Sequence, residues 1–348
     1  MTLSAIAPNL VETRRAVLHR LLDDSLQLGP EYEAGMASHL PMALAALDGI
    51  GAHEAQMRSF YAHYARRLAP APVAQEKGDR PIDDWRSLRG RIDAFATLRG
   101  HFAAARSRDG RDALLRDALP ALMDGSAGAA FHGPIRVAHA VESGHDGELA
   151  AALAYFAARW RPLPRPSRPD TVFTDPAAWL DALDARQRRT APGWRSPASL
   201  ISERMQDAAL TGAWRELADA LVPVDGDVPA LLAALAKAAA ARYAATGNFT
   251  VLHMATASRA VRVLAPWMPA QAAAWKPLLH AVAAASIAAR AVPLRRDVST
   301  ALAWADVRRA ACASDDDHVI KLVHAMAMQH ALAPEPVWLE AARTAVRN

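Results

Sequence analysis

The stretch Asp315–His330 (DDDHVIKLVHAMAMQH) places ionisable side chains on an otherwise apolar helical pattern. At about 100° per residue, His318, Lys321 and His324 follow one another at steps of about 60° on one side of the helix. Imidazole and amine groups are costly to bury without a partner, and imidazole is a common metal ligand. The pattern predicts either a metal site or a satisfied core, in which Lys321 extends to the surface and His318 bonds a carbonyl.

Single histidines also occur in other apolar stretches. His132 and His139 share a helix face but lie about 10 Å apart along its axis, so at most one of them binds any single ion. His39 stands at a predicted helix start, where capping and metal binding are both open, and His253 and His280 lie on apolar helix faces. The remaining histidines are predicted to be at the surface: His19, His53, His63, His101, His145 and His330.

No contiguous catalytic or metal motif accompanies these histidines. The sequence has no His-Glu-x-x-His, no cysteine pair, no phosphate-binding glycine loop, no dinucleotide fingerprint and no nucleophile elbow. What remains is a set of single imidazoles on separate helices, a donor type that suits iron, zinc, copper or nickel. Facing helices of an α-bundle can build such a site, so we expect either a buried metal site between helices or merely hydrogen-bonded core histidines.

Helix-forming residues dominate the elements that must position these side chains, and alternating β-branched runs are nearly absent. We therefore predict one all-α, multi-helix domain over residues 1–348, with loops at Ala69–Pro81 and Trp160–Asp170, the second a possible surface linker (160–170). The expected helices are Leu10–Ser25, Pro41–Leu47, His53–Leu68, Ile82–Arg106, Gly110–Met123, Ala127–Glu142, Gly147–Trp160, Pro176–Gln187, Pro197–Leu210, Gly212–Leu221, Pro229–Thr246, Phe249–Leu264, Pro269–Ala289, Val298–Ala311, Asp315–His330 and Pro334–Val346.

Composition narrows the class of protein. A net charge of +4 is small for 348 residues, and no dense basic cluster with aromatics occurs, so we expect no nucleic-acid partner. The single cysteine, Cys312, excludes an internal disulfide, and no signal-peptide pattern begins the chain. The most apolar region, Leu264–Pro293, contains charged residues, so we expect no membrane span and a cytoplasmic location. Only four of the 40 basic residues are lysines, which draws attention to Lys321.

Four local strings, in this order, resemble the questin oxidase-like family, which includes fungal enzymes of anthraquinone and aflatoxin-type polyketide pathways and many bacterial proteins. The resemblance runs from about Leu21 to Ala333 and is specific only in combination. The strings are SHLPMALAALDGIGA (Ser38–Ala52), AAFHGPIRVAHAVESG (Ala129–Gly144), LHMATASRAVR (Leu252–Arg262) and DDHVIKLVHA (Asp316–Ala325).

The resemblance implies a non-haem Fe(II) oxygenase that opens an aromatic or quinone ring with O2, a Baeyer–Villiger-like outcome without a flavin. It implies iron held by histidines and by a lysine carboxylated on its side-chain nitrogen. The implied metal ligands are His39, His132, His253, His318 and Lys321, with His280 in reserve for His318. The implied catalytic residues are His39, His132, His253 and Lys321, and a reductant such as NADPH is a further possible requirement.

The chemistry of the residues agrees with this expectation. An apolar environment favours the neutral amine that carboxylation requires, which an arginine cannot provide. The carbamate and the imidazoles together would give a donor set close to that of His-and-carboxylate Fe(II) oxygenases. Aromatic residues that would line a substrate pocket, or simply fill the core, are Tyr32, Phe131, Trp267 and Trp304.

The sequence departs from the family pattern at three positions. Ser38 stands where Asn is frequent, Pro134 where Leu is usual, and His324 where histidine is often absent. These positions affect hydrogen bonding around the ligands or the shape of the pocket, and so bear on the substrate more than on the metal. The alternative function is a non-catalytic helical protein that binds a small aromatic ligand. The oligomeric state is not indicated by the sequence.

Overall fold

The computed structural model describes residues 7–33, 35–72, 84–294 and 302–347. Within these residues the chain forms sixteen α-helices and one short antiparallel strand pair, β1 (Glu31–Tyr32) with β2 (Met36–Ala37). The helices are α1 (Ala7–Ser25), α2 (Leu40–Ile50), α3 (Glu54–Ala65), α4 (Phe95–Asp109), α5 (Arg111–Leu122), α6 (His132–Ser143), α7 (Asp146–Ala158), α8 (Pro176–Thr190), α9 (Ile201–Ala208), α10 (Gly212–Leu217), α11 (Val228–Thr246), α12 (Phe249–Leu264), α13 (Lys276–Ala289), α14 (Trp304–Cys312), α15 (Asp317–Leu332) and α16 (Pro336–Arg347).

The all-α prediction is confirmed, and the helices form one domain. Most expected helices differ from the observed ones by a few residues at each end. The expected helix Ile82–Arg106 was wrong: its described part contains two 3-10 turns, Trp85–Leu88 and Ile92–Ala94, before α4. Gly90 separates these turns with a φ of 76°, a left-handed conformation that interrupts a helix and that glycine adopts without strain.

A second difference lies at the expected helix Ala127–Glu142. The observed α6 begins only at His132, because the three residues before it, Ala129, Ala130 and Phe131, have φ values of 45°, 52° and 68°. The sequence feature behind this late start is Pro134, which suits the first turn of a helix and not its interior. Of the expected helix Val298–Ala311, residues 298–301 lie outside the described residues, and α14 begins at Trp304.

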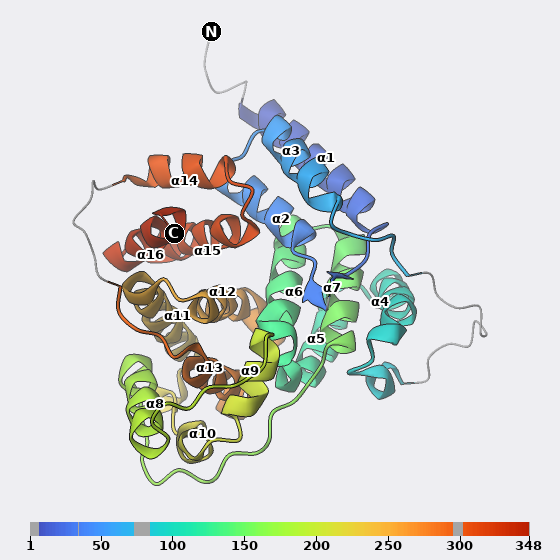
Figure 1. Cartoon of the computed structure of the whole chain (residues 1–348). Helices are drawn as coiled ribbons and strands as arrows, with labels where there is room; N and C mark the ends of the chain where they lie inside the picture. Colours follow the sequence, from blue (N-terminus) through green and yellow to red (C-terminus); the bar gives the residue numbers. More distant parts are fainter. Residues whose placement is uncertain (1–6, 34, 73–83, 295–301, 348) are drawn as a thin grey trace.

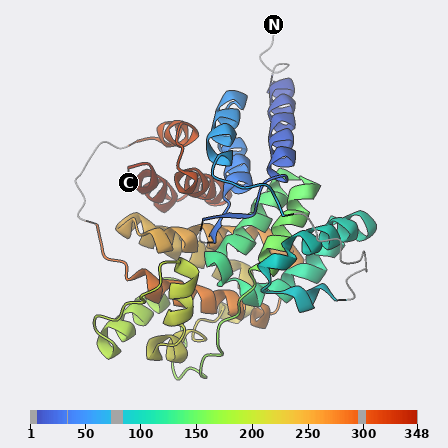
Figure 2. The same ribbon diagram turned by 45° about the vertical axis from the view of Figure 1, so that its right-hand side comes forward.

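Four helices occupy the centre of the molecule and pack against one another in a closed circuit: α2 against α15, α15 against α12, α12 against α6, and α6 against α2. Around this centre, α1 and α3 lie at one end and α8 and α10 at the other, while α4, α5 and α7 cover one side (Figures 1 and 2). The apolar side chains of these layers form a continuous core, so the four central helices hold buried side chains in fixed positions.

The proline-rich stretch 160–170 connects α7 to α8 without regular structure and runs along the outside of the molecule (Figure 1). Hydrogen bonds at Trp160 and at Ser167 hold it against the rest of the domain. The Trp160 indole donates to Asp124 at 2.6 Å, and the Ser167 backbone N–H donates to the Arg215 carbonyl at 2.8 Å. The segment is therefore a surface crossing within one domain and does not separate two domains.

Within the described residues, two apolar segments pass a length and composition test for membrane spans: α11 (Val228–Thr246) and the segment Ala272–Ala289, which includes α13. Half of the first and two thirds of the second are buried inside the fold. Core helices of soluble proteins pass the same test, so this is weak evidence for a membrane location.

Candidate metal centre

The amino-terminal ends of the four central helices meet at one point, and each of them supplies a histidine there. His39 immediately precedes α2, His132 is the first residue of α6, and His318 is the second residue of α15. His253 follows one turn into α12. Helix amino-termini carry partial positive charge, so the meeting point favours anions and neutral imidazoles over further positive charge.

The four imidazole rings lie against one another. The ring centroids of His39 and His132 are 4.4 Å apart, those of His39 and His318 are 4.7 Å apart, and His253 lies 5.0 Å from His132 and 5.3 Å from His318. One ring nitrogen from each of His39, His132 and His318 lies within 4.8 Å of the others, a spacing from which small rotations bring three nitrogens to one ion. We call His39, His132, His253 and His318 the cavity cluster.

Hydrogen bonds fix which nitrogen of each ring faces the centre. Nδ1 of His132 contacts the Ala129 carbonyl, and Nδ1 of His253 lies 2.8 Å from the Phe249 carbonyl. Because a carbonyl only accepts, both rings carry their proton on Nδ1 and present the lone pair of Nε2. Such bonds are typical of metal-binding histidines, where an acceptor behind the ring sets its orientation.

The free nitrogens are buried without compensation. Nε2 of His132 and Nε2 of His318 have no hydrogen-bond partner in the described part of the chain. Burial lowers the pKa of His39 to about 3, and burial lowers the pKa values of His132 and His253 well below the ordinary range. Neutral imidazoles with an unpaired lone pair are the form that binds a metal ion, so the donor set fits such an ion.

Asp317 is the residue that sequence reasoning missed. Its carboxylate lies 2.5 Å from Nδ1 of His39, 3.0 Å from Nδ1 of His318 and 3.3 Å from Nζ of Lys321. Although burial raises the pKa of Asp317, the neighbouring His39 and Lys321 hold it well below its ordinary value. We did not select this aspartate from the sequence, although its spacing of four residues from Lys321 was an available signal.

Lys321 is buried beside the cavity cluster, with 3 % of its surface exposed. Burial lowers the pKa of its amine, against the attraction of Asp317. The prediction that Lys321 extends to the surface is therefore wrong, and the prediction that it belongs to the histidine group is consistent with its position.

A cavity of about 190 Å³ opens onto the four histidines. Of the aromatic residues expected there, only Tyr32 lines it; Phe131 lies in the core, Trp267 bonds Asp112 and Trp304 packs on His330. The aromatic side chain that sequence reasoning missed is Phe249, which lies 4.9 Å from the His253 ring and 4.6 Å from the His318 ring. Its position one turn before His253 was the available signal.

The other histidines lie elsewhere. His280, the reserve ligand, is outside the cavity cluster: its Nε2 lies 3.0 Å from Asp219, next to Lys276. His324 lies one turn beyond Lys321, beside His139 and not at the cavity. His145 was expected at the surface but is buried, because its Nδ1 accepts from the Glu148 backbone N–H at the start of α7.

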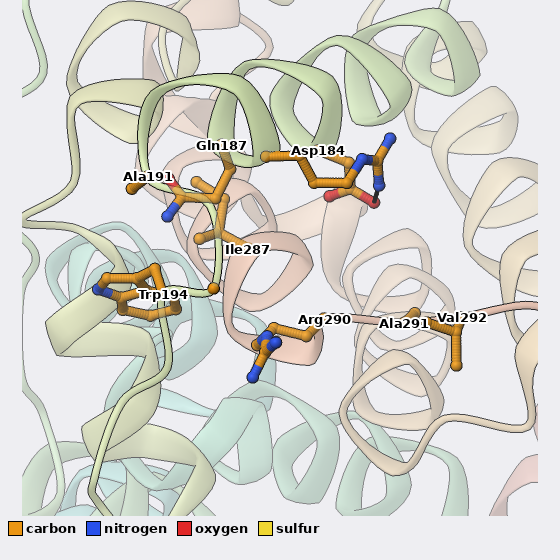
Figure 3. A pocket seen from close by; sticks show the side chains of 10 residues that line it. Asp184, Gln187, Ala191, Trp194, Ile287, Arg290, Ala291 and Val292 are labelled. Carbon is orange, nitrogen blue, oxygen red and sulfur yellow. Dashed lines mark ion pairs between the residues drawn. The ribbon is translucent and has the colours of Figure 1, made fainter.

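A second hollow, of about 160 Å³, lies between α8 and the end of α13 (Figure 3). Trp194 and Ile287 form its apolar walls, and the buried amide of Gln187 has no hydrogen-bond partner in the described part of the chain. Its described lining includes no histidine, so it lacks the donor set of the cavity cluster. The candidate site is therefore the histidine cavity.

Comparison with known proteins supports the same region. A search of curated proteins found no match. A family model described as questin oxidase-like matches residues 36–326, a range that contains all four histidines of the cavity cluster, Asp317 and Lys321. The family's name points to an oxidoreductase of the oxidase or oxygenase type. Because the match covers most of the 348 residues, the chain belongs to the questin oxidase-like family.

Proposed function

We propose that this protein is a non-haem Fe(II)-dependent oxygenase that cleaves a ring of an aromatic or quinone polyketide-type substrate with O2, in a Baeyer–Villiger-like oxidation. The observation that carries the proposal is the convergence of four buried imidazoles from four helices at the base of a cavity, beside a buried lysine. His39, His132, His253, His318 and Lys321 would hold the metal. Bound Fe(II) supplies the one-electron chemistry that O2 needs in order to react with a closed-shell ring.

Lys321 is suited to carboxylation, which would make it an anionic ligand. Its neutral amine attacks CO2, an N–C bond forms, and the nitrogen loses a proton, for which Asp317 Oδ1 at 3.3 Å is a nearby acceptor. Once Asp317 has passed this proton on to solvent, the carbamate and Asp317 are two adjacent anions in a buried site. Their repulsion is offset only by a bound cation, so carboxylation and metal loading should depend on each other.

The cavity walls favour a flat, partly anionic substrate. Tyr32 and Phe249 offer aromatic faces. Ser199, which precedes α9, and Ser202 and Arg204, in its first turn, contribute polar groups. The Nε of Arg204 is buried without a hydrogen-bond partner in the described part of the chain. A phenolate or quinone oxygen would satisfy that group, so we assign Arg204 the role of orienting the substrate ring above the histidines.

The deciding experiment combines metal analysis with O2 consumption. We expect purified protein to contain about one iron per chain at the cavity cluster, and an anthraquinone-type substrate to increase O2 uptake in iron-loaded protein. His132→Ala should lose both the iron and the uptake. Arg204→Met should keep the iron and raise KM, because it alters only substrate contacts. Lys276→Met, a half-exposed lysine outside the cluster, is the matched control and should change neither.

Two results would contradict the proposal. If iron-loaded protein binds the aromatic ligand but consumes no O2 either with or without NADPH, the non-catalytic binding function is correct. If His132→Ala and Lys321→Met retain the iron, the cavity cluster does not hold it.

The number of electrons taken from a reductant distinguishes a monooxygenase from a dioxygenase. A monooxygenase needs two electrons from a reductant such as NADPH for each O2, whereas a dioxygenase places both oxygen atoms in the product.

A further inference from the structure

A second group of side chains of types that can bind metal ions lies between two of the central helices, α6 and α15. His139 follows His132 by two turns on α6, and His324 follows Lys321 by one turn on α15. Their ring centroids are 5.2 Å apart, and both residues are at least 96 % buried. Glu142, one turn after His139, brings a carboxylate to the same place, with Oε2 3.9 Å from His139 Nδ1. We call these three residues the inner cluster.

Three atoms of the inner cluster lack the partners that buried polar atoms normally have. Nδ1 of His139, Nδ1 of His324 and Oε2 of Glu142 have no hydrogen-bond partner among the described residues. One donor atom from each residue lies within 4.8 Å of the other two. Buried polar atoms of folded proteins nearly always have a hydrogen-bond partner, so two imidazole nitrogens and a carboxylate oxygen without one in the same small group indicate a missing ligand.

The inner cluster is distinct from the cavity cluster. Seven residues separate His132 from His139, which is about 10 Å along a helix axis, too far for both to bind one ion. The inner cluster also faces α2, where Gly49 makes room for it: a Cβ on residue 49 would lie 2.4 Å from Nε2 of His324. Glycine inside a helix is less stable than alanine, and the space that the His324 ring occupies explains its presence here.

The charges around the inner cluster leave its donor atoms in the protonation states that bind a metal ion. Arg259 of α12 is buried and pairs with Oε1 of Glu142, so the carboxylate stays anionic while Oε2 remains free. Burial lowers the pKa values of His139 and His324 well below the ordinary range, which keeps both imidazoles neutral. Two neutral imidazoles and one carboxylate remain for a ligand.

We propose that His139, Glu142 and His324 form a second metal site, which binds a divalent transition-metal ion such as Zn²⁺ or Fe²⁺ between α6 and α15. Two imidazoles with one carboxylate suit these ions, and facing helices of an α-bundle are a common scaffold for them. An ion there joins the two helices that carry His132, His318 and Lys321. Its role is to fix the distance between α6 and α15, and therefore the spacing of the histidines of the cavity cluster that these helices carry.

The test counts Co²⁺ ions bound by the full-length protein after its own metals have been removed with a chelator. We expect the unmodified protein to bind two equivalents, measured by elemental analysis together with the visible absorption of bound Co²⁺. Glu142→Gln and His139→Ala should each bind one equivalent. His132→Ala should also bind one, with a different absorption spectrum, because the ion that remains is the one in the inner cluster.

A variant that keeps all three donor residues tests whether a lost equivalent of metal results from the missing donor or from unfolding of the protein. Gly49→Ala should displace the His324 ring and weaken binding of the second equivalent at least tenfold. Gly100→Ala in α4, where a Cβ meets nothing within 4 Å, is its control and should bind two equivalents. Circular dichroism of each variant checks that the helices are intact.

The outcome that overturns this proposal is one equivalent in the unmodified protein that disappears in His132→Ala and persists in Glu142→Gln and Gly49→Ala. The inner cluster would then be a hydrogen-bonded core without an ion. This result is distinguishable from failure of the proposed oxygenase, because a cavity cluster without metal would leave one equivalent that disappears in Glu142→Gln.

Discussion

Two groups in this protein contain the same residue types in different surroundings. Beside the cavity cluster, Asp317 contacts His39, His318 and Lys321. At α13, Asp219 contacts His280 at 3.0 Å and Lys276 at 2.7 Å. The Lys276 side chain is 42 % exposed and that of Lys321 is 4 % exposed. The first group lies at the ends of four helices, whereas Lys276 and His280 belong to α13 alone.

The difference shows that histidine, aspartate and lysine in contact do not by themselves make a metal site. At the exposed group, water satisfies whatever the protein leaves unpaired, and Lys276 remains in a simple ion pair. At the buried group, Nε2 of His132 and Nε2 of His318 have neither a protein partner nor appreciable exposed surface, so a ligand that enters the cavity gains the energy of satisfying them. Convergence of helices and exclusion of water distinguish a candidate centre from a surface pair.

The largest expected difference between the two groups concerns the metal itself. His318→Ala should lower the iron content of purified protein by more than half, because it removes one of three ring nitrogens that lie within 4.8 Å of one another. His280→Ala should leave the iron content unchanged. Elemental analysis of both variants, purified side by side, measures the effect. Equal iron loss in both would mean that the geometric distinction between the groups has no functional meaning.

The two lysines should respond differently to CO2. Iron loading of the unmodified protein should increase when bicarbonate is added to CO2-depleted buffer, because the carbamate on Lys321 supplies an anionic ligand. Lys321→Met should load little iron with or without bicarbonate, and Lys276→Met should behave like the unmodified protein. If iron loading of all three proteins is independent of bicarbonate, Lys321 acts only as an ammonium partner of Asp317.

The two aspartates provide a smaller contrast. Asp317→Asn should lower iron affinity by about 10–100-fold, the usual effect of removing a carboxylate that orients metal-binding histidines. Asp219→Asn should leave iron affinity unchanged and alter the free energy of unfolding by about 1 kcal/mol or less. Chelator competition gives the affinity and urea denaturation gives the stability. An unchanged affinity in Asp317→Asn would remove this residue from the site.

The last expected effect is a pH dependence of the metal-free protein. Because the folded pKa of His39 is about 3 and the unfolded value is near 6.5, only the unfolded chain binds this proton between those pH values. Stability should therefore fall as the pH drops below about 6.5, by up to about 1.4 kcal/mol per pH unit for each such histidine. His39→Gln should reduce the slope of the unfolding free energy against pH by about the contribution of one histidine. Urea denaturation at several pH values measures this slope. A slope identical to that of the unmodified protein would show that His39 is protonated in the folded state.

The site was only partly predictable from the sequence. Residues His39 and His318 could be selected because helix starts and a family resemblance mark them, and the structure brings both to one place. The contact between Asp317 and His39 could not be predicted, since nothing near Asp317 in the chain shows that His39, 278 residues away, contacts its carboxylate. The inner cluster was missed for the same reason: His139 and His324 come together only when α6 and α15 pack.

The sequence by itself determined the helices, their caps and the types of donor atoms, because these depend on neighbours within a few residues. It also determined the family, through short strings around the histidines. Only the tertiary structure decided which imidazoles share a centre, which lysine loses contact with water, and that His280 stands apart. The physical reason is that burial and convergence depend on contacts between distant segments, and the free energy of an unpaired nitrogen is set by whether water can reach it.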